Sequence, residues 1–547
     1  MKKFGAVFAV LAIAAVTAIG LASCGSSGSS STSGKEGGTL NATYASFPDY
    51  LDPQLSYTAE GWTAMYDTYL PLLTYKHASG TAGSEVIPGL AKALPKVTNG
   101  GKTYTLFLRR GLKYSNGQPV KASDFRYSVE RMFKLNSPGS PFYTDIVGAE
   151  KFAETKSGGI PGIKTNDKTG EIIIHLIKPR GTFNNELGLL FVAVIPKGTP
   201  VRNLTPSPPP ATGPYVITKS EPGRGWSYER NPAWTKTNAK LIPEVPSGHV
   251  DKIDITVVRN NSTQVNEIER GKTDWMQNPP PPDLYAKVKE KYEGTQLRVE
   301  PTVSTYYFWM NMKKPPFNDL KVRQAVNYAL NSEAFERIYS GQLKGSHQIL
   351  PPGMPGHQEF DLYPYNMAKA KRLIREANPT DRNITVWTDT EPENSEATAY
   401  YQNVLTKLGF NAKLKEINAD TYTTVIGNQS TPDLDTGWYD WFEDYPHPND
   451  YFQPLLSGES ILKTNNTNFS MTDIPALNAK VASLGETALD PQREAGYAEL
   501  DKNYMEQAPW APYGTRTITT FVSSAIDLNK VIYNPTFEDD LTSFQFK

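Results

Sequence analysis

Two hydrophobic periodicities alternate along the chain. In 103–110, TYTLFLRR, every second residue is apolar, which is the period of a half-buried β-strand. In 122–135, apolar residues recur every three or four positions, which is the period of an amphipathic helix. The same two patterns predict further strands at 171–177, 252–258 and 384–388, and further helices at 318–330, 366–377 and 395–409. Strands that alternate with helices in this way predict an α/β fold.

Capping and breaking residues predict where these elements begin and end. Ser123 and Asn318 are expected to cap two of the helices, and Gly409 is expected to end a third. Two proline-rich stretches, 205–215 and 278–283, cannot form helix interiors or central strands. We therefore expect both stretches to be surface connections.

The N-terminal pattern is that of an export signal. Lys2 and Lys3 precede an apolar run, 4–21, which ends in small residues, so we expect a signal peptide at 1–23. The sequence LASC, ending at Cys24, resembles the bacterial lipobox, which predicts lipid on this thiol and attachment to the membrane. The Gly/Ser-rich residues 24–38 are then expected to be a flexible tether. The alternative is an ordinary secreted protein with an incidental cysteine.

Composition limits the possible partners. Cys24 is the only cysteine among 547 residues, so no disulfide can form within the chain, and a chain of this length is expected to form two or three domains. The net charge is −1, with 56 basic and 57 acidic residues. Such a balance argues against nucleic acid and against an anionic membrane surface as partners.

Local catalytic motifs are missing from the sequence. The six histidines are scattered singly, and the sequence contains no HExxH, Walker, GxGxxG or GxSxG pattern. We therefore expect neither an enzyme nor a resident metal or cofactor. A hydrolase that uses two carboxylates distant in sequence remains a remote alternative.

Acidic and aromatic residues are concentrated in 435–450, DTGWYDWFEDYPHPND. A carboxylate between aromatic walls suits a ligand ammonium group, through charge-assisted hydrogen bonds and cation–π contact. A metal site would require several of these oxygens to converge with His447. The structural alternative is a solvated acidic loop whose aromatic side chains pack in the core.

Several segments together resemble the family-5 extracellular solute-binding proteins of ABC importers, the oligopeptide- and dipeptide-binding lipoproteins. The most specific is 104–132, YTLFLRRGLKYSNGQPVKASDFRYSVERM. Shorter blocks follow the family's order: YLDPQLS (50–56), PGLAKAL (88–94), TGPYVI (212–217), PPFNDLKVRQAVNYAL (315–330), LPPGMPG (350–356), DYPHP (444–448) and APWAP (508–512). The resemblance covers nearly the whole chain after the signal peptide.

The resemblance implies a two-lobed, flytrap-like α/β fold with an additional subdomain inserted in the first lobe. Lobe I would comprise 39–70, 205–303 and 507–547, the inserted subdomain 71–204, and lobe II 304–506. Ligand would bind between the lobes and be enclosed when they hinge shut.

The resemblance also implies a function and a set of ligand contacts. The protein would be an extracytoplasmic, monomeric receptor that delivers oligopeptides to an ABC permease and its ATPase subunits. Asp444 is the expected partner of the peptide α-ammonium, with Trp441 and Tyr445 beside it and Tyr50 a weaker candidate from the opposite lobe. Some relatives carry a basic residue for the peptide carboxylate where this chain has Trp438. A receptor of the same fold for sugars or metal chelates is therefore the main alternative.

Overall fold

The computed structural model describes residues 34–547. The expected signal peptide, Cys24 and most of the expected tether lie outside the described residues. The tether was expected to reach residue 38, but Lys35 donates a backbone hydrogen bond to Phe546, and Gly37 donates one to His249. These last residues are therefore attached to the folded body by main-chain hydrogen bonds, which composition alone does not reveal. No helix in the described part of the chain is both long and apolar enough to cross a membrane.

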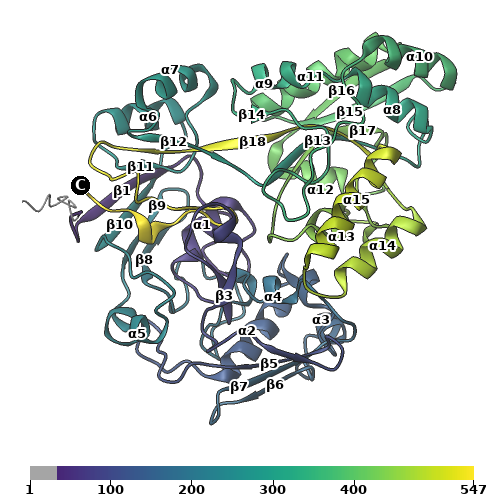
Figure 1. Cartoon of the computed structure of the whole chain (residues 1–547). Coiled ribbons are helices and arrows are strands. Elements are labelled where there is room, and N and C mark those ends of the chain that lie inside the picture. Colours follow the sequence, from purple (N-terminus) through teal and green to yellow (C-terminus); the bar gives the residue numbers. More distant parts are fainter. Residues whose placement is uncertain (1–33) are drawn as a thin grey trace, which may run out of the picture.

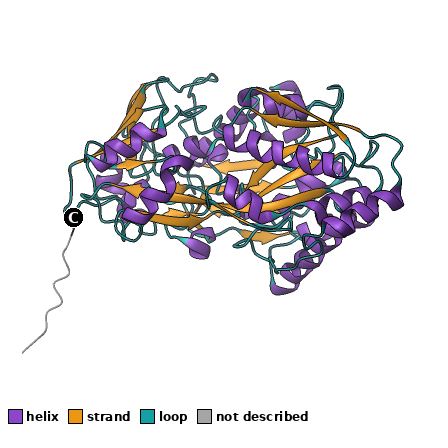
Figure 2. Cartoon of the chain, turned by 90° about the horizontal axis from the view of Figure 1, so that it is seen from above, coloured by secondary structure: helices purple, strands orange, loops and turns teal. Residues whose placement is uncertain are grey.

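A large mixed sheet of twelve strands runs through the molecule, and Figure 2 shows helices packed outside its strands. Ten of the strands follow one another in the order β16-β15-β17-β13-β18-β11-β1-β10-β9-β8, while β12 and β14 pair with β18 off this path. Their bounds are β1 Thr39–Tyr44, β8 Tyr215–Glu221, β9 Gly225–Arg230, β10 Lys252–Val257, β11 Trp275–Met276, β12 Leu297–Pro301, β13 Ser304–Met310, β14 Leu343–Lys344, β15 Asn383–Asp389, β16 Asn411–Ile417, β17 Thr436–Phe442 and β18 Trp510–Val522.

Strand β18 connects the two halves of this sheet. Its first part pairs with β13 and β14, and its last part pairs with β11 and β12, all antiparallel. In Figure 1 this yellow strand crosses the upper part of the molecule from the β13 side to the β11 side. Almost every one of its residues is buried, which is expected for a strand covered on both faces.

A smaller antiparallel sheet lies at the lower end of the molecule in Figure 1, in the order β4-β5-β7-β6. Helix α2 packs against it through the predicted apolar stripe, in which Phe125, Val129, Met132 and Phe133 are all buried. The remaining strands form two hairpins. The bounds are β2 Leu73–Tyr75, β3 Val86–Pro88, β4 Lys96–Thr98, β5 Thr103–Phe107, β6 Ile163–Asn166, β7 Glu171–His175, β19 Tyr533–Asn534 and β20 Glu538–Asp539.

The helices follow the predicted pattern, but two of their start positions differ from the prediction. Helix α2 begins one residue before Ser123, whose hydroxyl instead donates to Asp167, and the side chain of Asp124 accepts from the Lys121 backbone. Asp319, not Asn318, caps α8. The helices are α1 Ala59–Tyr66, α2 Ala122–Lys134, α3 Ala149–Thr155, α4 Phe183–Glu186, α5 Ala239–Leu241, α6 Asn261–Glu269, α7 Pro282–Tyr292, α8 Leu320–Ala329, α9 Ser332–Ile338, α10 Met367–Ala377, α11 Pro392–Lys407, α12 Ala419–Ile426, α13 Asn449–Leu456, α14 Pro475–Gly485 and α15 Pro491–Gln507.

Buried apolar side chains form separate clusters along this architecture. One cluster draws its residues from 303–513, a second mainly from 62–245, and a third from residues 40–64, 215–275 and 522–544. Each fully buried large apolar side chain contributes roughly 1.5–3 kcal/mol, so each cluster is large enough to stabilise its own region. The α/β class predicted from periodicity is confirmed, whereas the expected domain boundaries stay a prediction.

Candidate ligand-binding site

The acidic and aromatic stretch begins as a strand and ends as a loop. Strand β17 pairs with β13 along its whole length, from Thr436 opposite Met310 to Phe442 opposite Ser304. The chain then leaves the sheet, and the prolines at 446 and 448 keep it irregular until α13 begins at Asn449. Glu443 and Asp444 therefore lie where a rigid strand gives way to a loop, a common position for binding residues.

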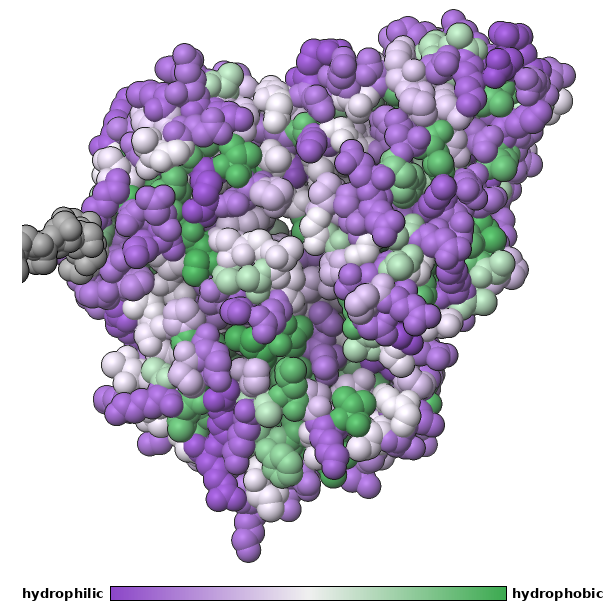
Figure 3. Space-filling view, in the orientation of Figure 1, coloured by the Kyte–Doolittle hydropathy of each residue, from purple (hydrophilic) through white to green (hydrophobic). Residues whose placement is uncertain are grey.

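These two acids face a cavity of about 200 Å³ formed by three distant parts of the chain. The face of the molecule seen in Figure 3 is mostly hydrophilic and is hollowed near its centre, where its left-hand and right-hand parts meet. The residues that line the cavity are Tyr57, Thr58, Ala59, Trp62, Val303, Phe442, Glu443, Asp444, Tyr533, Pro535, Thr536 and Glu538. None of these residues is basic, although three of them are acidic.

Asp444 forms hydrogen bonds with residues from two distant parts of the chain. The Tyr57 hydroxyl donates a 2.7 Å hydrogen bond to its Oδ2, and the Asp444 backbone N–H donates a 2.9 Å bond to Asp450 Oδ2. Burial raises the pKa of Asp444 to about 7, although the hydrogen bond from Tyr57 opposes the shift. An aspartate with such a pKa is partly protonated at neutral pH and would be stabilised as a carboxylate by a cation.

The neighbouring acids are also perturbed. Burial raises the pKa of Glu443 to about 8, and its Oε2 has no hydrogen-bond partner. Burial and the adjacent Asp444 raise the pKa of Asp450 well above its ordinary value. Across the cavity, burial raises the pKa of Glu538 to about 7. The site thus contains more buried carboxylates than its own hydrogen-bond donors satisfy.

The three aromatic candidates do not line the cavity; they are Trp441, Trp438 and Tyr445. Trp441 is half-buried, and its Nε1 donates to Asp450 Oδ2 at 3.1 Å, so it orients this acid rather than lining the cavity. Trp438 is buried and donates to the Tyr513 hydroxyl at 2.9 Å. Tyr445 is buried in the second apolar cluster. In this conformation, therefore, Asp444 is the only one of these candidates from the 435–450 stretch whose side chain borders the cavity.

The candidate from the opposite side, Tyr50, is half-buried and does not line the cavity. The aromatic residue that reaches Asp444 is Tyr57, seven positions further along the chain. Sequence reasoning missed Tyr57, Thr536 and Glu538, because nothing in their local sequence shows that the fold brings them together. Glu443 lies inside the acidic stretch, so its position there was a signal that could have identified it as a candidate site residue.

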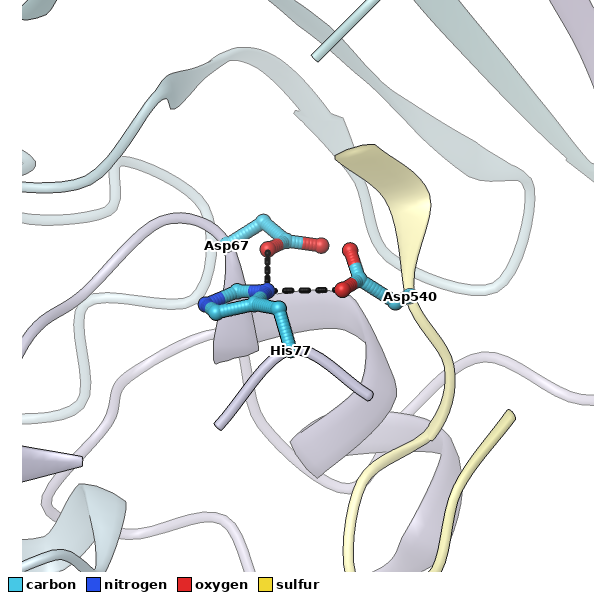
Figure 4. A group of neighbouring side chains, drawn as sticks. All are labelled: Asp67, His77 and Asp540. Carbon is cyan, nitrogen blue, oxygen red and sulfur yellow. Dashed lines mark hydrogen bonds and ion pairs between the residues drawn. The ribbon is translucent and has the colours of Figure 1, made fainter. Parts of the chain in front are cut away.

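Figure 4 shows a second cluster of ionisable side chains, none of which lines the cavity. Asp67, His77 and Asp540 are all buried, and their nearest ligand-type atoms lie within 4.8 Å of one another. His77 Nδ1 lies 2.6 Å from Asp540 Oδ2 and 3.7 Å from Asp67 Oδ1. The shorter contact is a hydrogen bond, which leaves no space for a metal between those two atoms. Burial opposes ionisation of Asp540, but His77 lowers the pKa of this carboxyl group, so the cluster is a buried hydrogen-bonded group that attaches the C-terminal segment.

Comparisons with known proteins agree with this architecture. The sequence profile described as "Bacterial extracellular solute-binding proteins, family 5 Middle" matches residues 85–462. The chain is 26% identical over 475 residues to heme-binding protein A of Haemophilus influenzae, covering 81% of each protein. It is also 26% identical over 433 residues to the periplasmic oligopeptide-binding protein OppA of Salmonella typhimurium, covering 75% of this chain and 76% of that one.

A solved structure shows the same fold. The structure titled "Clavulanic acid biosynthesis oligopeptide binding protein 2" superposes with a TM-score of 0.84 at 22% identity, covering 94% of this chain and 96% of that one. The two-lobed periplasmic-binding-protein fold expected from the resemblance is therefore confirmed. The chain belongs to the family-5 extracellular solute-binding proteins of ABC importers.

Proposed function

We propose that this protein captures oligopeptides outside the cytoplasm and delivers them to the permease of an ABC importer, whose ATPase subunits drive uptake. The observation that carries the proposal is the Asp444 carboxylate, which borders a cavity that no basic residue lines. A peptide α-ammonium would supply the missing positive charge and a short, charge-assisted hydrogen bond. The name of the OppA relative supports a peptide as the ligand.

Capture depends on a hinge between two lobes. We assign 39–70, 205–303 and 507–547 to lobe I, 71–204 to the inserted subdomain and 304–506 to lobe II. The separate buried clusters support this division, and the crossings at β13 and β18 are the expected hinge.

Ligand entry requires the lobes to separate. Small-molecule sites usually measure ≈300–1,000 Å³, whereas this cavity measures about 200 Å³. The hydrogen bond from Tyr57 to Asp444 closes it, since it joins the segment before α1 to the loop after β17. Opening breaks this bond, and an incoming ammonium group replaces the lost donor.

A thermal-shift experiment tests the peptide assignment. A free tetrapeptide at 100 times its dissociation constant should stabilise the protein by ~2.7 kcal/mol, which raises the melting temperature measurably. The N-acetylated tetrapeptide lacks the charged amine and should give little or no shift. A shift of equal size with both peptides would refute Asp444 as the ammonium partner, and no shift with either would refute peptide binding.

A metal chelate is the second candidate ligand, because one relative is named for heme binding. The surplus of carboxylates at the cavity disfavours it, since heme carries carboxylates of its own that like charges would repel. A sugar receptor has less support, because neither relative described above is named for a sugar, although aromatic side chains line the cavity. Hemin and an oligosaccharide belong in the same thermal-shift series as peptides, and a shift with one of them alone would overturn the peptide assignment.

We also propose that lipid on Cys24 holds the protein at the membrane as a monomer, and that the protein binds without breaking bonds. Cys24→Ser should move the protein from the membrane fraction to the soluble fraction of cells that express it. Peptides incubated with the protein should keep their mass. Accumulation of fragments in proportion to protein and time would instead support the hydrolase alternative.

A further inference from the structure

We propose that the cavity selects peptides whose first residue has a basic side chain, with Glu443 and Glu538 binding this second positive charge beside the α-ammonium at Asp444. The inference rests on the proposed peptide-binding function and specifies the substrate class of the same site. Its basis is the excess of carboxylates over the single positive charge that a peptide N-terminus supplies.

Three carboxylates border the cavity from two sides. Glu443 and Asp444 follow β17, whereas Glu538 lies in β20, close to the C-terminus. No lysine, arginine or histidine is among the residues that line the cavity. One α-ammonium compensates one carboxylate, so two carboxylates are left at the cavity without a positive partner.

Glu443 gives the clearest indication of a subsite for a cation. Its side chain is only 7% exposed, its Oε2 has no hydrogen-bond partner, and its Oε1 has a long contact of 3.5 Å with the Thr536 hydroxyl. Buried carboxylate oxygens normally have donors, because an unsatisfied one is costly. A cationic side chain in the cavity would supply the donors that the protein does not.

Glu538 is held in position from its own side of the cavity. Its Oε2 accepts hydrogen bonds from Gln277 Nε2 at 2.8 Å and from the Thr63 hydroxyl at 3.1 Å. These bonds fix the carboxylate and leave its other oxygen available to a ligand. Two carboxylates that line one cavity suit a guanidinium group, whose five N–H donors in a planar fork can bind more than one acceptor.

A bare metal ion does not fit this arrangement. Among the described residues, the group whose carboxylate and imidazole atoms lie close enough to share an ion is Asp67, His77 and Asp540, and none of these three lines the cavity. Glu443, Asp444 and Glu538 do not form such a group, so the three carboxylates do not converge on one small cation. A ligand with two separated positive charges satisfies them better.

The test compares three tetrapeptides by isothermal titration calorimetry at pH 7.5: Arg-Ala-Ala-Ala, citrulline-Ala-Ala-Ala and Ala-Ala-Ala-Ala. Citrulline matches arginine in size and shape but has no charge, so the ratio of their affinities isolates the side-chain charge. We expect the arginine peptide to bind at least about tenfold more tightly than the citrulline peptide. Glu443→Gln and Glu538→Gln should each reduce this ratio to about twofold or less. Glu459→Gln, at an exposed acid far from the cavity lining, is the control and should keep the ratio.

Each outcome is decisive. Equal affinity for the arginine and citrulline peptides overturns the basic-residue inference and leaves peptide binding intact. A full arginine preference in both glutamine variants overturns the assignment of Glu443 and Glu538. Failure of all three peptides to bind refutes the proposed function together with the inference. The comparison in the unaltered protein decides the matter even if a variant fails to fold.

Discussion

Asp444→Asn should make the ligand-free protein more stable and its ligand binding weaker. The pKa of Asp444 is about 7 in the folded protein, against an ordinary value of 3.8, because the carboxyl group is buried without a cation. Between these two values the folded state binds more protons than the unfolded state, so stability falls as pH rises from about 4 to 7. An amide of the same shape removes this cost.

The size of the effect follows from the shift. About three pKa units correspond to about 4 kcal/mol of destabilisation once the folded group is ionised, at pH 8. This pKa already includes the opposing effect of the Tyr57 hydrogen bond, so that bond is not subtracted again. We therefore expect a gain of about 4 kcal/mol at pH 8 and of about 1 kcal/mol at pH 4.5, where the folded carboxyl group is already protonated.

Thermal unfolding of both proteins at the two pH values measures this difference. The melting temperature of the variant should exceed that of the parent by several degrees at pH 8, and by much less at pH 4.5. The same variant should bind a free peptide about 30-fold more weakly or worse, since it loses a buried charge pair. An equal gain at both pH values, or no gain at pH 8, would refute a buried, uncompensated carboxylate. Glu459→Gln should change neither property.

Three further substitutions test other parts of the structure. Tyr57→Phe removes the bond that closes the cavity, so the ligand-free protein should have a larger radius of gyration by small-angle X-ray scattering, and an unchanged radius would contradict that role. Gly181→Val adds a side chain at a position where a Cβ would already lie 1.9 Å from the Thr487 carbonyl oxygen. Peptide affinity should fall, while the melting temperature of the ligand-free protein should change little. Unaltered affinity would show that the contact between residues 181 and 487 is irrelevant to closure. Asp52→Ala leaves Arg131 buried without its carboxylate partner and should lower the free energy of unfolding, measured by chemical denaturation, by about 3–5 kcal/mol. The double variant Asp52→Ala, Arg131→Met should recover most of this loss. Losses that simply add in the double variant would contradict a coupled pair.

The periodic pattern of apolar residues predicted secondary structure better than it predicted helix ends. The apolar stripe of α2 is buried as expected, because burial of that face determines the helix. The start of a helix depends on which of several polar neighbours accepts the free N–H groups. Asp319 rather than Asn318 accepts the N–H group at the start of α8, and Asp124 rather than Ser123 accepts at the start of α2. The capping free energies of such residues differ by only fractions of a kcal/mol.

The candidate site was predictable only where its residues are neighbours in sequence. Asp444 and Glu443 belong to one acidic stretch, so composition draws attention to both. Tyr57 lies 387 residues away from Asp444, and its contact depends on how the lobes meet. Trp438 shows the converse, since an aromatic ring beside acids can equally pack in a core, as this one does in this conformation, and its role as a ligand contact stays a prediction. The sequence pattern shows which side chains could bind a ligand, whereas the fold determines which of them come into contact.

The position of β18 has a consequence for the order in which the chain can fold. Residues 510–522 complete both halves of the large sheet, and they follow all its other strands in the chain, so they are synthesised after them. Until they arrive, β13 lacks one neighbour and β11 and β12 lack another, so neither half can reach its final stability. In a nascent chain, the large sheet therefore stays incomplete until β18 has been synthesised, whereas the cluster drawn mainly from 62–245 contains no β18 residue and does not depend on it.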